Sequence, residues 1–175
     1  MATLLLDELV RTDYGQFDLG WSPDAGFDGD VDRFFAGQVN GLVGAADVHV
    51  VYVNLARRSG GSRVRIVPRD GPPAEVEPDW EDVVEVSTTL PDGAEARWMT
   101  WAGEEGRPLA DLTPGDYRVR VSANGRDAGQ AGEFADRVVD EYLIELWPAR
   151  CEPDAILLTT SHNARYWHSE WGGRR

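Results

Sequence analysis

Short runs of β-branched and apolar residues, separated by turns that contain Gly and Pro, recur along the whole chain and limit the folds it can adopt. Apolar and charged residues alternate in 117–121, as in a strand with one face in water. The almost continuously apolar run 48–55 is typical of a central strand buried on both faces. About eight such strands favour an all-β fold, a single antiparallel β-sandwich with short helical connections, over a βαβ fold. The expected strands are 9–19, 48–55, 63–67, 83–90, 94–101, 117–121, 138–147 and 155–159, and the expected short helices lie near 30–35 and 130–137.

Turn sequences suggest which strands are neighbours. Ser59-Gly60-Gly61-Ser62 lies between two of the expected strands and predicts that 63–67 is the hairpin partner of 48–55. Pro91-Asp92-Gly93 likewise predicts that 94–101 returns beside 83–90.

The length of 175 residues suits one full-sized domain, and we expect a single β-sandwich domain over 1–175 whose residues 161–175 form a C-terminal aromatic tail. Cys151 is the one cysteine of the sequence, so the fold does not depend on an intrachain disulfide. The apolar run at the N-terminus is interrupted by Asp7 and Glu8 and has no basic segment before it, unlike a signal peptide. No apolar run approaches the roughly 20 residues of a membrane helix. We therefore expect a cytoplasmic protein.

The charge is strongly negative. The sequence has 31 Asp and Glu residues against 17 basic ones, for a formal net charge of -14. Such a chain repels nucleic acids and anionic membranes at long range and attracts a basic protein partner. No direct binding to nucleic acid or membrane is expected.

Acidic residues gather in two stretches. No basic residue lies between Arg69 and Arg97, where nine acidic residues fall. This charge would steer a basic partner, such as a nucleic-acid-binding surface that the protein blocks, although a solvated surface would carry the same pattern. The partner-binding residues that we predict are Glu75, Glu77, Asp79, Trp80, Glu81 and Asp82. The second acidic stretch contains Glu133, Asp136, Asp140, Glu141 and Glu145.

No motif predicts a catalytic, cofactor or metal site. Asp28, Asp30 and Asp32 alternate as at the start of a calcium loop, but Arg33 and Val39 stand where that loop needs Gly and Glu. Pairs of His or Cys at zinc-ligand spacing, phosphate-binding glycine loops and nucleophile elbows are all missing from the sequence. We expect a polar turn at Ser161-His162-Asn163, no enzymatic activity, no cofactor and no metal.

Two aromatic groups leave alternatives open. The tail Tyr166-Trp167-His168-Ser169-Glu170-Trp171 either packs back on the sandwich and closes its core, or anchors a partner or a second copy of the chain. Trp98, Trp101 and Trp147 either belong to the core or line a pocket for a small molecule or a substrate. A structural homo-oligomer is a third alternative.

Three stretches carry a family resemblance: Gln38-Val39-Asn40-Gly41-Leu42-Val43-Gly44-Ala45-Ala46, Leu112-Thr113-Pro114-Gly115-Asp116-Tyr117-Arg118-Val119-Arg120-Val121 and Asp140-Glu141-Tyr142-Leu143-Ile144-Glu145-Leu146-Trp147-Pro148. Through them the chain resembles a group of uncharacterised actinobacterial proteins and, more distantly, the competence protein J (ComJ, Nin) family. The similarity runs over roughly 9–150 and transfers no binding residues. The resemblance implies a small, acidic, cytosolic and non-enzymatic protein with an inhibitor or immunity-type role, which binds a nuclease or a toxin.

Overall fold

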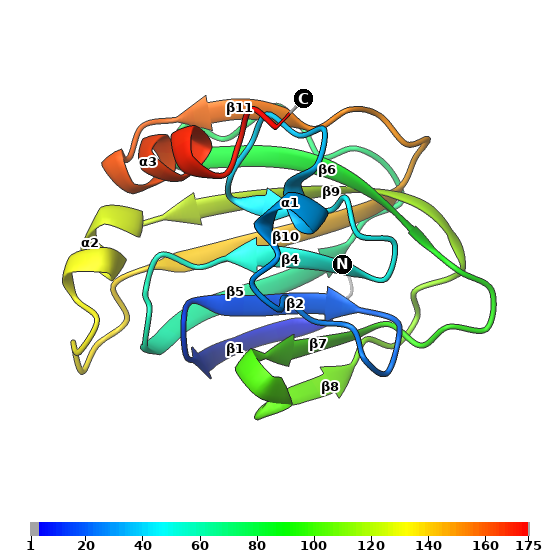
Figure 1. Ribbon diagram of the computed structural model, residues 1–175, viewed down its shortest axis with the longest axis horizontal. Helices are drawn as coiled ribbons and strands as arrows, with labels where there is room; N and C mark the ends of the chain where they lie inside the picture. Colours follow the sequence, from blue (N-terminus) through cyan, green and yellow to red (C-terminus); the bar gives the residue numbers. More distant parts are fainter. Residues whose placement is uncertain (1–3, 175) are drawn as a thin grey trace.

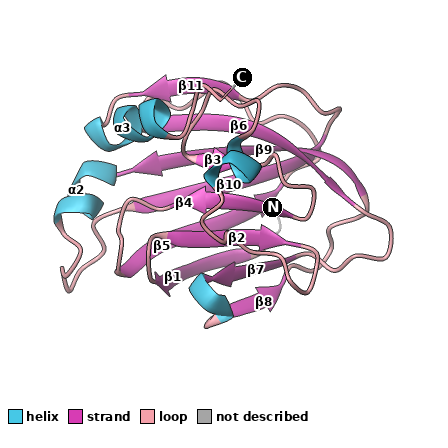
Figure 2. Ribbon diagram, viewed as in Figure 1, coloured by secondary structure: helices cyan, strands magenta, loops and turns pink. Residues whose placement is uncertain are grey.

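The computed structural model describes residues 4–174, and these form two β-sheets with few helices (Figures 1 and 2). The six-stranded sheet has the order β1 (Leu6–Thr12), β5 (Gly60–Pro68), β10 (Glu141–Pro148), β9 (Gly115–Asn124), β6 (Asp82–Leu90) and β11 (Ala155–Thr159). The five-stranded sheet has the order β3 (Val43–Gly44), β4 (Val50–Asn54), β2 (Gln16–Gly20), β7 (Arg97–Thr100) and β8 (Gly106–Pro108). The helices are α1 (Val31–Phe35), the 3₁₀ turn η1 (Trp101–Gly103), α2 (Arg126–Ala131) and α3 (His162–Glu170). The expectation of a β-rich fold with short helices is confirmed.

One hydrophobic cluster contains buried side chains of both sheets. Phe17 and Leu19 of β2 enter it from the five-stranded sheet, and Val119 and Ile144 enter it from the six-stranded sheet. The ring of Phe17 stacks on that of Trp98 with the centroids 5.7 Å apart. Burying each of these side chains contributes about 1.5–3 kcal/mol, so the alternation read in the sequence sets the inward face of the strands.

The segment 9–19, expected as one extended strand, divides into β1 and β2 at a sharp turn. Tyr14 and Gly15 both adopt positive φ, of 57° and 64°. A Cβ on Gly15 would lie 2.3 Å from the carbonyl oxygen of Leu55, so only glycine fits. The turn sends the chain from one sheet into the other. It also leaves the side chain of Tyr14 57% exposed.

Both expected hairpins are wrong. β5 pairs with β1 and β10 rather than with β4, and β7 pairs with β2 and β8 rather than with β6. At the first corner the buried guanidinium of Arg57 donates to the carbonyl of Gly61 at 2.7 Å and to carbonyls of the loop that follows α2. These bonds hold the chain where it crosses between sheets, and a turn sequence does not reveal such a crossing.

β5 and β10 pair in parallel, whereas an antiparallel sandwich was expected. Between β5 and β10 the chain forms β6 to β9 and α2. A connection of that length allows the two strands to run either parallel or antiparallel to each other. Every other strand pair is antiparallel among the residues that the structure describes.

The helices match the expectations unequally. α1 forms at the expected place, and the Oδ1 of Asp30 caps it by accepting from the amide of Arg33 at 3.1 Å. α2 begins four residues earlier than expected, because Gly125, at φ 73°, turns the chain directly out of β9. The tail 161–175, expected without regular structure, contains α3, and Ser161 is the cap of that helix rather than part of a polar turn.

Candidate binding groove

The outer face of the five-stranded sheet is polar and yet buried. Gln16 and Asp18 of β2 lie opposite Asn54 and Tyr52 of β4, and each of the four is at most 6% exposed. Such side chains normally face water on the outside of a sheet. Here other elements cover them, which creates the setting for a site.

A small aromatic cluster covers one part of this face. Phe34 and Phe35 of α1 pack on Tyr52, whose ring also stacks on that of Phe27 at a centroid distance of 4.0 Å. Trp171, which follows α3, closes the cluster from the C-terminal side.

Beside this cluster lies an open groove of about 840 Å³. Its floor includes Gln16, Tyr52 and Asn54 of the sheet. Its walls come from the turn between β1 and β2, the loop before α1, η1, α2 and α3, and the aromatic residues among them are Tyr14, Phe27, Trp101, Tyr166, Trp167 and Trp171. A volume of this size is typical of sites for small organic molecules.

The aromatic walls stand in pairs. The ring centroids of Tyr14 and Trp101 are 5.3 Å apart, and those of Tyr166 and Trp167 are 5.0 Å apart. Tyr14 and Tyr166 are more than half exposed, so their apolar faces are available to a ligand. Tyr14 lies in the turn between β1 and β2, and Trp101 is the first residue of η1. The other pair belongs to α3, and both pairs line the same groove.

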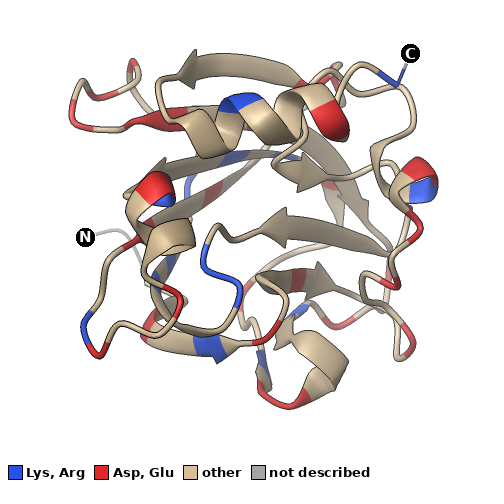
Figure 3. Cartoon of the chain, turned by 60° about the vertical axis from the view of Figure 1, so that its left-hand side comes forward, with Lys and Arg blue, Asp and Glu red and all other residues tan. Residues whose placement is uncertain are grey.

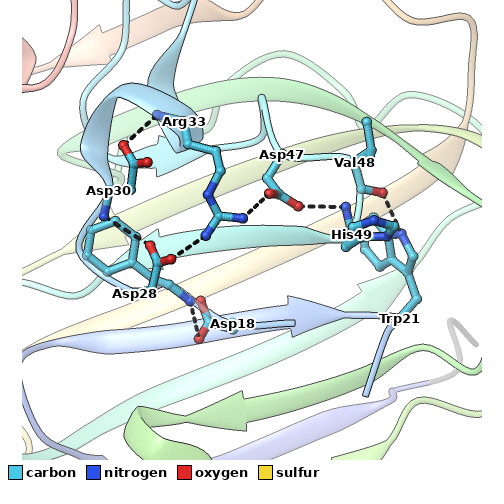
Figure 4. Close-up of polar contacts among 9 residues, drawn as sticks. Asp18, Trp21, Asp28, Asp30, Arg33, Asp47, Val48 and His49 are labelled. Atoms are coloured by element: carbon cyan, nitrogen blue, oxygen red, sulfur yellow. Dashed lines mark hydrogen bonds and ion pairs between the residues drawn. The ribbon is translucent and has the colours of Figure 1, made fainter. Parts of the chain in front are cut away.

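A polar network holds the loop that carries Phe27 and Asp28 (Figure 4). The guanidinium of Arg33 bridges two carboxylates, those of Asp28 at 2.7 Å and Asp47 at 2.5 Å. The amide of Phe27 donates to the Oδ2 of Asp18 at 3.3 Å, and the indole of Trp21 donates to the carbonyl of Val48. These contacts fix one wall of the groove against the sheet.

The same network assigns roles to the alternating carboxylates of the loop. Asp28 accepts from the amide of Asp30 and pairs with Arg33, and these interactions lower its pKa. Asp30 caps α1, and Asp32 pairs with Arg174. Each of the three carboxylates therefore has a structural contact within the fold. Among residues 4–174 no three His, Cys, Asp or Glu side chains are grouped so that they could hold a metal ion.

The opposite wall depends on α3, which buried polar contacts hold in place. The hydroxyl of Ser161 donates to the Oδ2 of Asp82 at 2.5 Å and accepts from the amide of Ala164 at 3.0 Å. At the other end of the helix, the amide of Gly41 donates to the Nδ1 of His168 at 3.0 Å. The tail thus packs back on the fold, and Tyr166 is left exposed at the groove.

Behind the groove lies a buried arginine. Arg126 is 1% exposed; its Nε donates to the Oδ1 of Asn163 at 3.0 Å and its Nη1 to the carbonyl oxygen of Asn54 at 2.8 Å. Asn163 in turn donates to Gln130. Three residues of this network, Asn54, Gln130 and Asn163, line the groove.

Two donors of the network have no partner. They are the Nη2 of Arg126 and the Nδ2 of Asn54. Arg126 also forms no ion pair with any carboxylate of the described residues. The nearby Asp140 is instead hydrogen-bonded to Ser62 and Tyr142. A buried cation without a carboxylate partner and a buried amide without a hydrogen-bond acceptor both lower the free energy of unfolding.

Asp18 is a second unusual group beside the groove. Burial raises its pKa to about 6, although hydrogen bonds from Gln16 and from the amide of Phe27 lower it. Its Oδ1 has no hydrogen-bond partner. The carboxyl group therefore changes its charge near pH 6.

The predicted partner-binding residues are only partly on the surface. Glu75, Glu77 and Asp79 are exposed in the loop before β6, and Trp80 is half-buried under the guanidinium of Arg65. Glu81 accepts from the amide of Gly125 at 2.8 Å. Asp82 is fully buried and holds Ser161 and the amide of Thr160, so it is removed from any contact surface.

Acidic residues occur in loops around much of the molecule (Figure 3), and several members of the second acidic stretch have structural roles. Asp140 is buried, Glu145 pairs with Arg69 at 2.6 Å, and Glu141 pairs with Arg65. Burial raises the pKa of Asp140. Of that stretch, Asp136 is exposed and Glu133 lines the groove.

Sequence reasoning found the groove only in part. Of the three tryptophans considered for a pocket, Trp101 lines the groove, whereas Trp98 and Trp147 are buried. Gln16, Asn54, Arg126 and Asn163 were missed because each belongs to a different element. The spacing of Trp167 and Trp171, four apart after a capping serine, is the signal that could have revealed α3.

No helix within 4–174 combines the length and the apolar character that crossing a membrane requires.

Two sheets with a common core and few helices define a β-rich fold, and known structures share this fold. One is ComJ from Bacillus subtilis, the inhibitor of the DNA degrading activity of NucA: the TM-score is 0.56 at 17% identity, over 85% of this chain and 99% of that one. Another is the protein of crocagin biosynthetic gene J, with a TM-score of 0.53 at 18% identity, over 86% of this chain and 99% of that one. The distant resemblance to ComJ is confirmed at the level of the fold. No family model and no curated protein matches the sequence.

Proposed function

We propose that this chain is a single-domain β-sandwich protein that binds and inhibits a basic protein partner, a nuclease or a toxin, without catalysing a reaction. The observation that carries the proposal is the loop before β6, where Glu75, Glu77 and Asp79 are exposed and no basic residue lies between Arg69 and Arg97. The fold shared with an inhibitor of a DNA-degrading activity supports it. Such an inhibitor would act in the cytoplasm.

The acidic loop would act by occupying the groove in which the partner binds nucleic acid. A basic groove attracts carboxylates as it attracts phosphates, and complementary charge raises the rate of association. Glu75, Glu77 and Asp79 would supply the charge, and Trp80 a partly buried aromatic anchor. Glu81, which binds the amide of Gly125, would contribute less, and Asp82 nothing directly.

The test reverses three charges together. The triple variant Glu75→Arg, Glu77→Arg, Asp79→Arg should lose most of its affinity at low salt for a partner captured with the unaltered protein. Its melting temperature should stay near that of the parent, because the three side chains are exposed. The matched control is Asp24→Arg, Asp92→Arg, Glu104→Arg, which changes the net charge equally at other exposed positions. If both triples weaken binding to the same extent, only overall charge matters and the loop is not the contact surface.

A second candidate function is binding of a small molecule, and the aromatic groove is the observation that favours it.

Light scattering at several protein concentrations would detect self-association of the chain, which neither candidate function requires.

A further inference from the structure

The geometry points to the groove as a binding site for an aromatic carboxylate, a planar ring system that carries one carboxylate group. This inference deepens the second candidate function and is independent of the acidic loop, because none of the loop residues 75–82 lines the groove.

The ring would lie between the two aromatic walls. Tyr14 and Trp101 form one pair, Tyr166 and Trp167 form the other, and both pairs line the groove. Trp101 is 36% exposed and both tyrosines more so. Exposed aromatic rings provide apolar surface and stacking partners for a planar ligand.

The carboxylate would be bound at the floor. Asn54 lines the groove, is 4% exposed and has an unpartnered Nδ2 donor. Directly behind it the unpaired guanidinium of Arg126 donates to the carbonyl oxygen of the same residue and keeps Nη2 free. A carboxylate in the groove can accept from the amide of Asn54, and its charge is attracted by the guanidinium of Arg126 behind that residue. An uncharged acceptor would supply only the hydrogen bond.

Other charges near the groove do not exclude an anion. Asp28 is already paired with Arg33, and Arg58, over the ring of Tyr14, offsets Glu133 among the lining residues. The net charge of -14 is spread over the molecule, and at physiological salt its field is screened beyond about 8 Å. The carboxyl group of Asp18, beside Gln16, opposes an anion above about pH 6, whereas the guanidinium of Arg126, which is hydrogen-bonded to Asn54, attracts it at the floor.

The experiment compares three probes that share one ring system: naphthalene-2-carboxylate, naphthalene-2-carboxamide and naphthalene. Their dissociation constants for the full chain are measured by isothermal titration and ligand-observed NMR. We expect the carboxylate to bind about tenfold more tightly than the carboxamide, and naphthalene to bind most weakly. Equal affinity for carboxylate and carboxamide, or no binding of the carboxylate at millimolar concentration, overturns the inference.

Two variants locate the site. Asn54→Ala should weaken the carboxylate about tenfold and leave naphthalene almost unchanged, because it removes one hydrogen-bond donor. Trp101→Ala should weaken all three probes about fivefold. Phe134→Ala, an aromatic change at an exposed position that does not line the groove, is the control and should leave the affinity of all three probes unchanged. Circular dichroism verifies that each variant folds, and probe binding that is unaffected by both groove variants contradicts the proposed site. Partner affinity of the same variants is measured separately, so a failure of probe binding is distinguished from a failure of partner binding.

Discussion

Asp18 is a carboxyl group that the fold holds in an unfavourable environment. It is 1% exposed, its Oδ1 has no partner, and burial raises its pKa from the ordinary 3.8 to about 6. The folded state therefore binds the Asp18 proton more tightly than the unfolded state. Between those two pKa values stability falls as the pH rises, and above pH 6 the full penalty is present.

The variant Asp18→Asn removes this penalty. Relative to the parent, its free energy of unfolding should gain about 2 kcal/mol between pH 4 and pH 7.5, because the pKa change is equivalent to about 1.4 kcal/mol per pKa unit and a part of the penalty is already present at pH 4. Urea denaturation of both proteins at several pH values measures the difference. A difference that does not depend on pH would mean that Asp18 titrates normally.

Gly41 is a residue at which a single methyl group should displace a helix. A Cβ there would lie 1.9 Å from the carbonyl oxygen of Trp167, a backbone atom that no side-chain rotation can move away. Gly41→Ala should therefore destabilise the protein by about 3 kcal/mol and change the fluorescence of Trp167 and Trp171. Gly71→Ala, where a Cβ meets nothing within 4 Å, should be nearly neutral in a thermal melt.

At the scale of elements, α3 decides whether one wall of the groove exists. Its first turn is held by Ser161, which is hydrogen-bonded both to the helix and to the buried carboxylate of Asp82. Two backbone amides, those of Thr160 and Ser161, also donate to Asp82. Several hydrogen bonds to one residue of β6 therefore fix the start of α3.

Ser161→Ala should cost about 2 kcal/mol in the free energy of unfolding, because it removes the cap and one partner of a buried carboxylate. Ser169→Ala, at an exposed position of the same helix, should cost much less. Chemical denaturation of both variants tests the difference, and equal effects would contradict the role given to the cap.

At the scale of the whole molecule, the net charge of -14 opposes the compact state. Salt screens this repulsion, so the melting temperature should rise by roughly 2–4 °C between about 20 mM and about 300 mM NaCl. The variant Asp24→Asn, Asp92→Asn, Glu104→Gln should show a smaller rise. A melting temperature that falls with salt would mean that surface ion pairs, such as Arg63 with Asp7, outweigh the repulsion.

The amino-acid sequence by itself determined the positions of most strands, the inward face of each and the acidic character of the chain. Alternation in 117–121 and the apolar run 48–55 correspond to β9 and β4, because a strand repeats every two residues whatever its neighbours are. The short helix α1 followed from local signals in the same way.

Only the tertiary structure decided which strands pair and which polar residues meet. β5 and β10 lie far apart in the chain and pair in parallel, and the energy of that pairing depends on the whole sheet. Asn54, Arg126 and Asn163 come from β4, α2 and α3, and no periodicity links them. The covered outer face, and with it the groove, arises because α1 and the segment that ends α3 pack on a face where the alternation of β2 predicts water.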